Sequence, residues 1–255
     1  MGSRTTSVLI KIGLFIAAVL IVVMLVAKRY VYFQPKTDFL HTHSSREDFE
    51  DVQHGHLHGR MFRGDESNHK LILYCHGNQG NLSYYDDRID GLNRLGYSIL
   101  IFDYSGYGKS SGVPSEQQCY DDVSTMLALV RQQYAPGEVI LYGFSMGAVI
   151  AAYAARRYGI DTLILEAPLP SIASFIENKL KPLCFLKFLF NNFDLKALLD
   201  GRKGRTLLMY SNEDEIISAK SVIPIQRYAT ETIVVPGPHN SLKIPYDQVQ
   251  AFIEG

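Results

Sequence analysis

Short apolar runs recur along the chain at intervals that suit the buried strands of one sheet. They cover residues 71–75, 97–102, 138–142, 162–165, 205–210 and 232–235. Segments with helical patterning separate them, at residues 84–95, 115–134, 148–158 and 219–228, with a last one after Pro245. Strands that alternate with helices form a mostly parallel sheet with helices on both faces. We therefore predict an α/β fold, preceded by a hairpin whose strands are 47–53 and 57–63.

One long segment interrupts this alternation. Residues 168–201 leave the sheet pattern after one strand, return before the next, and carry a dense apolar and aromatic cluster. We predict that this insertion forms a lid over a catalytic face, with Phe185 and Phe188 contacting substrate. An extra helix pair with an ordinary buried face would explain the same pattern, and the two interpretations are compatible.

The N-terminus has a different pattern. Residues 8–27 are about 20 in number and almost wholly apolar, the length that spans a bilayer as a helix. A cleaved signal peptide is the alternative, but no small-residue cleavage site follows at Lys28 and Arg29. We predict an uncleaved, single-pass signal anchor over residues 1–33, a tether at 34–46 and a folded domain at 47–255. Basic residues on both flanks leave open the side of the membrane on which that domain lies.

Composition narrows the class of protein. The chain has 255 residues, 47% hydrophobic and 20% charged, with a formal net charge of −1 and no basic face. Nucleic acid is therefore not an expected partner. The three cysteines stand far apart, which argues against a disulfide framework or a zinc site. His54, His56 and His58 alternate, but no nearby cysteine or carboxylate completes a ligand set, so we expect no metal and no cofactor.

The chemistry centres on Gly143-Phe144-Ser145-Met146-Gly147, between a predicted strand and a predicted helix. In that context Gly-x-Ser-x-Gly forms a nucleophile elbow, in which a strained turn lifts the serine hydroxyl above the sheet. Side chains at Gly143 and Gly147 would collide with neighbouring backbone. We expect Ser145 to be a nucleophile and the amide of Met146 to be an oxyanion donor.

A serine nucleophile needs a base and an acid that orients the base. His239 follows the last predicted strand, and Asp214 follows the strand that ends at Tyr210. The order Ser145, Asp214, His239 is the one that accompanies this elbow. Glu166, directly after a strand, is a weaker candidate for the acid. Glu215 is weaker still, because the apolar pair that follows it suggests the start of a helix.

The loop after the first parallel strand, His76-Gly77-Asn78-Gln79, is placed to supply the second oxyanion donor. We assign the amide of Asn78, with that of Gln79 as the alternative. The ring of His76 is expected to hold this loop rather than to act as a base.

These motifs, together with Asp103-Tyr104-Ser105-Gly106-Tyr107-Gly108, resemble the α/β-hydrolase superfamily over residues 47–255. The likeness is to membrane-anchored serine hydrolases with a His-Gly-Asn loop, a group that includes protein depalmitoylases and lysophospholipases. Such relatives usually carry arginine where this chain has Ser105, so we expect an ion pair that braces the loop to be missing.

The resemblance implies a serine esterase or thioesterase whose substrate is a lipid-like acyl ester, a lipid or an S-acylated protein. Two alternatives stay open. A serine peptidase would use the same motifs at the same spacing, and a catalytically silent domain of this fold would serve as a membrane-tethered interaction module.

Overall fold

The computed structural model describes residues 2–31, 48–179 and 193–255, and the chain divides into two units, 1–33 and 34–255. The predicted substrate contacts Phe185 and Phe188, the whole tether and the middle of the predicted lid lie outside the described residues.

The first unit is one helix, α1 (Gly2–Val31). Large apolar side chains along it are exposed, including Leu9, Phe15 and Leu25. In the described parts of the chain, no helix has both the length and the hydropathy required of a membrane span.

The second unit is built on an eight-stranded sheet with the order β1-β2-β4-β3-β5-β6-β7-β8. Its strands are β1 (Glu50–His54), β2 (Leu57–Phe62), β3 (Leu71–Cys75), β4 (Ser98–Phe102), β5 (Val139–Phe144), β6 (Thr162–Glu166), β7 (Thr206–Tyr210) and β8 (Glu231–Val234). The β1–β2 and β2–β4 pairs are antiparallel, and every other pair is parallel. The predicted hairpin and mostly parallel sheet are therefore confirmed.

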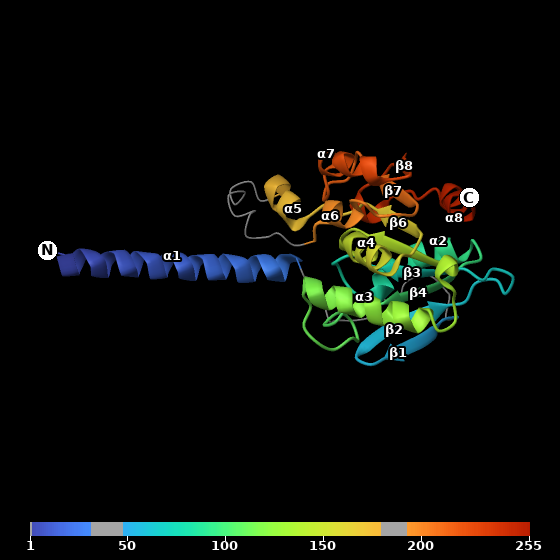
Figure 1. The fold of residues 1–255 in the computed structure, drawn as a ribbon, viewed down its shortest axis with the longest axis horizontal. Helices are drawn as coiled ribbons and strands as arrows, with labels where there is room; N and C mark the ends of the chain where they lie inside the picture. Colours follow the sequence, from blue (N-terminus) through green and yellow to red (C-terminus); the bar gives the residue numbers. More distant parts are fainter. Residues whose placement is uncertain (1, 32–47, 180–192) are drawn as a thin grey trace. The chain divides into compact units, whose positions relative to one another are not determined.

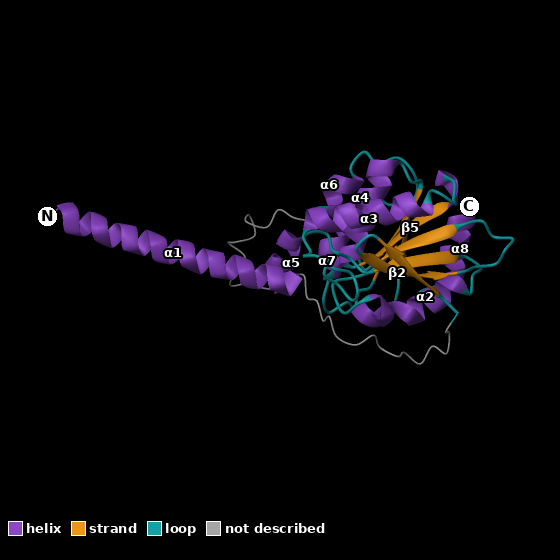
Figure 2. Cartoon of the chain, turned by 90° about the horizontal axis from the view of Figure 1, so that it is seen from below, coloured by secondary structure: helices purple, strands orange, loops and turns teal. Residues whose placement is uncertain are grey.

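Helices cover both faces of this sheet, as Figure 2 shows. The longer ones are α2 (Asp86–Asn93), α3 (Glu116–Val130), α4 (Met146–Tyr158) and α8 (Tyr246–Glu254). Alternate residues of the central strands, such as Ile72 and Tyr74 of β3, form one buried cluster with side chains of α2 and α8. The intervening residues point to the other face, where α3 and α4 pack together. Both faces of the central part of the sheet are apolar for this reason, and β3, β4 and β5 are buried throughout.

Several helices differ in detail from the prediction. The segment expected at 84–95 begins as a 3₁₀ turn, η1 (Leu82–Tyr85), before α2. Its capping residue is Asn81, whose side chain accepts from the amide of Ser83. The segment expected at 219–228 is α7 (Ala219–Val222) followed by 3₁₀ turn η4 (Ile223–Tyr228). Pro224 lies at the start of η4, where its ring is incompatible with the α-helical hydrogen bond to the preceding turn.

The interruption at 168–201 contains two short helices, α5 (Ile172–Lys179) and α6 (Leu195–Leu199), on either side of the residues that are not described. Phe193, at the edge of that gap, is fully buried and contacts the ring of Tyr120. Figure 1 shows α6 beside α4, which agrees with their contacts. At least this end of the insertion therefore packs as an ordinary helical element, and the lid stays a prediction.

Candidate active site

The candidate nucleophile lies at the sharp turn between β5 and α4. Ser145 has a φ of 55° and a ψ of −117°, a conformation that L-residues rarely adopt. Its amide donates to the carbonyl of Glu166 at 2.9 Å, and its own carbonyl accepts from the amide of Leu169 at 3.1 Å. These bonds, made by β6 and the residues just after it, hold the strained backbone in place.

The two glycines of the motif are required by close packing. A Cβ at Gly143 would collide with the backbone of Gly147 and Ala148 in the elbow helix. A Cβ at Gly147 would collide with the carbonyl group of Cys75, at the end of β3. The collisions expected from the sequence are confirmed, and they show that the first turn of α4 abuts the strand from which the His76–Asn78 loop departs.

The structure brings the three predicted side chains into one hydrogen-bonded chain. His239 Nε2 lies 3.0 Å from Ser145 Oγ, and His239 Nδ1 lies 2.7 Å from Asp214 Oδ2. All three side chains are nearly buried. With the Nδ1 proton directed at Asp214, Nε2 is left to accept the proton of the Ser145 hydroxyl.

Asp214 is itself held by the loop that follows β7. Its Oδ1 accepts from the amides of Ile216 and Ile217, at 2.8 and 2.6 Å. One carboxylate oxygen is thus occupied by backbone donors while the other faces His239. This division fixes the direction in which Asp214 presents its charge.

Two further acids hold the histidine loop: Glu215, which was the weakest candidate for the orienting acid, and Glu213, which the sequence did not single out. Glu215 accepts from the amide of His239 at 3.0 Å, and Glu213 accepts from the amide of Gly237 at 3.2 Å. Glu215 does not begin a helix, since α7 starts at Ala219, so the reason given against it from sequence was wrong. The available signal was the run of three acids, Glu213-Asp214-Glu215, but it does not reveal which backbone groups the outer two acids meet.

Glu166, the other candidate acid, is committed elsewhere. It is fully buried, with Arg88 Nε donating to Oε1 at 2.9 Å and the Tyr142 hydroxyl donating to Oε2 at 2.8 Å. Burial by itself lowers the pKa of Arg88, but Glu166 and nearby tyrosines outweigh this effect and hold it above its ordinary value. Arg88 and Glu166 therefore form a buried ion pair, and among the described contacts of Glu166 none is to His239.

The ring of His76 holds the loop after β3, as predicted. Its Nδ1 lies 2.6 Å from the carbonyl of Gly77, and the ring packs between Tyr85 and Tyr104. Burial lowers the pKa of His76, which favours the neutral ring. Neutral Nδ1–H then donates to Gly77, and the ring orders the backbone that leads into Asn78.

The predicted oxyanion donors come from two backbone segments that the packing brings together. Met146 is the first residue of α4, so its amide has no partner within the helix. The collision described for Gly147 places this turn against the carbonyl end of β3, two residues before Gly77 and three before Asn78. The arrangement suits a pocket for a negatively charged oxygen, whereas the roles of the two amides stay predictions.

The loop that begins at Asp103 is braced without an arginine. Ser105 donates its amide and its hydroxyl to the buried carboxylate of Asp122, at 2.7 and 2.9 Å. His56 Nε2 lies 2.8 Å from Ser105 Oγ and 3.4 Å from Asp122 Oδ1. A serine and a histidine from two different segments thus surround the acid.

Of the described residues, neither Cys75 and Cys119 nor the histidine-rich hairpin forms a second reactive centre. Burial raises the pKa of the Cys75 and Cys119 thiols, which disfavours the nucleophilic thiolate. His58 lies 2.9 Å from Asp51, and His56 lies against Ser105. In the described ranges, no group of three or more histidines, cysteines or acids could hold a metal ion.

Comparison with known proteins agrees with this architecture. Residues 66–203, more than half of the chain, match a family model described as serine aminopeptidase, S33. Alpha/beta hydrolase domain-containing protein 17B of Xenopus laevis is 36% identical over 151 residues, covering 57% of this chain and 50% of that protein. Protein 17C of Mus musculus is 34% identical over 164 residues, covering 62% and 50%. The matched part of the chain thus spans about half the length of these relatives.

Solved structures share the fold at low sequence identity. The esterase Pf2001 of Pyrococcus furiosus has a TM-score of 0.67 and 19% identity, covering 81% of this chain and 90% of that one. An alpha-beta hydrolase from Vibrio vulnificus has a TM-score of 0.65 and 20% identity, covering 80% and 77%. Sheet order, elbow and family match agree, and the chain belongs to the α/β-hydrolase superfamily, in the family described as serine aminopeptidase, S33.

Proposed function

We propose that this protein is a membrane-anchored serine hydrolase that cleaves ester or thioester bonds of lipid-like acyl substrates through an acyl-enzyme on Ser145. The observation that carries the proposal is the hydrogen-bonded chain from Ser145 through His239 to Asp214, beginning at a strained elbow. The names of solved proteins of this fold support ester chemistry, since one is an esterase and another is a thioesterase domain.

In the first half of the reaction, Ser145 Oγ attacks the acyl carbon and its proton passes to His239 Nε2. Asp214 stabilises the imidazolium that forms. The amides of Met146 and Asn78 donate to the oxyanion of the tetrahedral intermediate. His239 then gives its proton to the departing oxygen or sulfur, which leaves as an alcohol or a thiol.

In the second half, water attacks the acyl-enzyme and loses a proton to His239. The tetrahedral intermediate collapses, the proton returns to Ser145 Oγ, and the carboxylic acid departs. The proton of Ser145 leaves with the alcohol or thiol in the first half, and a proton from water replaces it in the second, so that the enzyme ends in its starting state.

The lipid-like acyl part of the proposal rests on two features of the sequence. The insertion at 168–201 is rich in leucine and phenylalanine, and Phe185 and Phe188 are our candidates for contact with the acyl chain. From Pro35 to Arg46 the tether has about a dozen residues and reaches at most about 40 Å, which confines the domain to the neighbourhood of a membrane. Each additional buried methylene then contributes up to about 0.8 kcal/mol to binding until the pocket is full.

To test this proposal, we would measure kcat/KM for a series of p-nitrophenyl esters and thioesters of increasing acyl length, beside peptide amides. We expect kcat/KM to rise over several carbons and then to level off, and Phe185→Ser to flatten the rise in a protein with an unchanged melting temperature. A preference for two-carbon esters would contradict the lipid-acyl proposal, and faster cleavage of peptide amides would favour the peptidase. Failure of any fluorophosphonate probe to label Ser145 would favour the silent interaction module.

Membrane anchoring is supported by the apolar run at 8–27 and by the exposed apolar side chains of α1. A charged residue at the centre of a spanning helix costs about 2.5–3.5 kcal/mol. We therefore expect Phe15→Lys combined with Val19→Lys to release the full chain from a carbonate-washed membrane pellet into the supernatant. Lys11→Leu is the matched control and stays in the pellet. If the double variant stays there too, α1 does not anchor the protein.

A further inference from the structure

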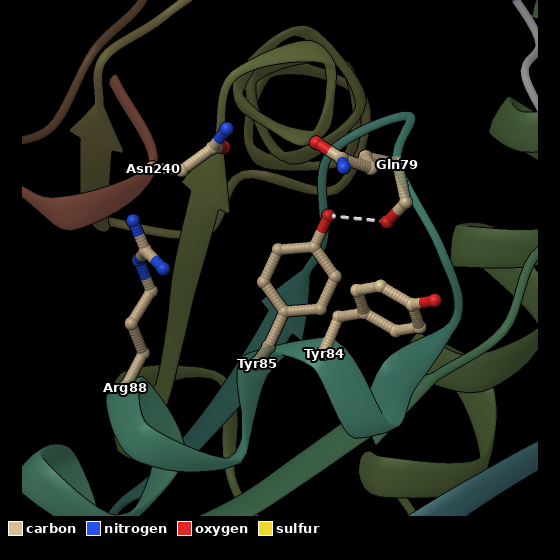
Figure 3. A pocket seen from close by; sticks show the side chains of 5 residues that line it. All are labelled: Gln79, Tyr84, Tyr85, Arg88 and Asn240. Atoms are coloured by element: carbon tan, nitrogen blue, oxygen red, sulfur yellow. Dashed lines mark hydrogen bonds between the residues drawn. The ribbon is translucent and has the colours of Figure 1, made fainter. Parts of the chain in front are cut away.

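A small cavity of about 140 Å³, with polar and apolar groups in its lining, lies beside the candidate active site. It is lined by Gln79, Tyr84, Tyr85, Arg88 and Asn240. Figure 3 shows the side chains of Gln79 and Asn240 on opposite sides, above Arg88 and the two tyrosines. Pockets that hold drug-sized ligands measure about 300–1,000 Å³, so this one accommodates only a small group.

Two residues of the lining are sequence neighbours of proposed catalytic groups, the base and an oxyanion donor. Asn240 is the residue after His239, and Gln79 is the residue after Asn78 in the proposed oxyanion loop. The floor is connected too, because the guanidinium of Arg88 lies 4.3 Å from the centroid of the Phe144 ring, and that ring lies 5.0 Å from the ring of His239. The cavity is therefore bordered by the histidine loop and by the proposed oxyanion loop.

The lining offers hydrogen-bond donors and one positive charge. Arg88 is the charged residue of the lining, and its side chain is 15% exposed. Its Nε is bound to Glu166, whereas its buried Nη2 has no hydrogen-bond partner among the described residues. In Figure 3 the guanidinium points up toward Asn240. Glu166 lies behind Arg88 and offsets part of its charge, so the cavity is weakly rather than strongly attractive to anions.

The hydroxyl of Tyr85 serves the neighbouring loop rather than the cavity. Burial raises the pKa of Tyr85, whose hydroxyl donates to the carbonyl of Gln79 at 2.9 Å. The hydroxyl is thus occupied in holding the oxyanion loop, and no carboxylate is among the lining residues. The polar groups of Gln79, Arg88 and Asn240 share the lining with the two tyrosine rings, so the cavity suits a small group that has both apolar and polar parts.

We propose that this cavity binds the leaving group of the substrate and selects one that carries an anionic oxygen, as a carboxylate or a phosphate. The inference rests on the proposed hydrolase activity. His239 must protonate the departing oxygen or sulfur, so the leaving group has to emerge on the side where Asn240 stands. The guanidinium of Arg88 and the amides of Gln79 and Asn240 then donate to its oxygens.

The test compares octanoyl esters that differ in the charge of the leaving group. O-octanoyl glycolate carries a carboxylate, O-octanoyl glycolamide is its neutral counterpart, and the octanoyl ester of 2-hydroxyethyl phosphate carries a phosphate. For the wild-type full chain we expect kcat/KM to be about tenfold higher for an anionic ester than for the glycolamide. Comparing kcat/KM for the glycolate ester with kcat/KM for the phosphate ester shows which of the two anions the cavity prefers.

Two variants add a negative charge to the lining without removing the Arg88–Glu166 pair. Asn240→Asp and Gln79→Glu act from opposite walls, and each should bring the anionic-to-neutral ratio to about one or below, because the new carboxylate occupies Arg88. Ser241→Asp is the matched control, since Ser241 is exposed in the same loop but is not part of the lining. It should keep the wild-type ratio.

A wild-type ratio near one would overturn the inference, and so would an unchanged ratio in both lining variants. In either case turnover of the glycolamide ester would leave the hydrolase proposal intact. If the wild-type protein cleaves none of the esters, the proposed function itself fails.

Discussion

Among the described residues of the second unit, two sets of serine, histidine and aspartate lie within hydrogen-bond distance and are arranged differently. In one, His239 stands between Ser145 and Asp214 and uses a different ring nitrogen for each. In the other, Ser105 donates to Asp122, and a single nitrogen of His56 faces both. The same three residue types thus produce a relay in one place and a brace in the other.

The order of contacts explains the difference. A hydroxyl becomes nucleophilic when a base takes its proton and an acid stabilises the charge on that base. Ser145 has this sequence of partners. The hydroxyl of Ser105, in contrast, donates its proton directly to the carboxylate of Asp122 and not to a histidine. Ser145 also stands at a strained turn, while Ser105 is 1% exposed. Side-chain composition alone would not separate the two sets.

The largest expected difference is between the two serines. Ser145→Ala should abolish fluorophosphonate labelling and lower kcat by about 10⁴-fold or more, with the melting temperature nearly unchanged. Ser105→Ala should keep full labelling but lose about 1–3 kcal/mol of unfolding free energy, because the buried Asp122 loses a donor. Labelling assays and denaturant titrations of both variants measure this. Full labelling of the Ser145 variant would refute the assignment of the nucleophile.

Asp214 and Asp122 should differ as the two serines do: substitution of Asp214 should lower activity, whereas substitution of Asp122 should lower stability. Asp214→Asn should lower kcat by about 10⁴-fold, because an amide favours the wrong tautomer of His239 and cannot stabilise the imidazolium. Asp122→Asn should leave kcat within a few-fold and lower the unfolding free energy by about 1–3 kcal/mol. Glu166→Gln serves as a second control, since we expect its cost to fall on stability through Arg88. If Glu166→Gln were the inactive variant instead, the acid of the relay would be Glu166.

The smallest effect is expected at His56, whose side chain is 44% exposed. His56→Gln should change kcat/KM by less than about twofold and lower the unfolding free energy by about 0.5–1 kcal/mol, since solvent replaces most of the lost contact. Loss of activity in a folded His56→Gln variant would show that the contacts of Ser105, His56 and Asp122 also control catalysis. That result would contradict the distinction between the two sets.

Much of the site follows from local sequence. The run around Gly143 to Gly147 has the pattern of a strand, a turn and a helix within a few residues. Its two glycines mark positions at which a side chain would collide with neighbouring backbone. Ser145, Asp214 and His239 could be placed because each follows an apolar run, and parallel strands present their carboxyl ends at one edge of the sheet. The alternation of apolar runs and helical segments predicted the sheet for the same reason.

Other features depend on contacts between residues far apart in the chain, and no local pattern specifies such contacts. Arg88 reaches Glu166 across 78 residues, which removes Glu166 from competition with Asp214. Glu215 reaches the amide of His239 across 24 residues, and His56 reaches Ser105 across 49. Helix and strand patterns arise from neighbours along the chain, whereas the partner of a buried charge is set by which elements pack together. The sequence alone therefore determined the elbow and the order Ser145, Asp214, His239, and only the tertiary structure decided which further acids hold the histidine loop and which serine is a brace.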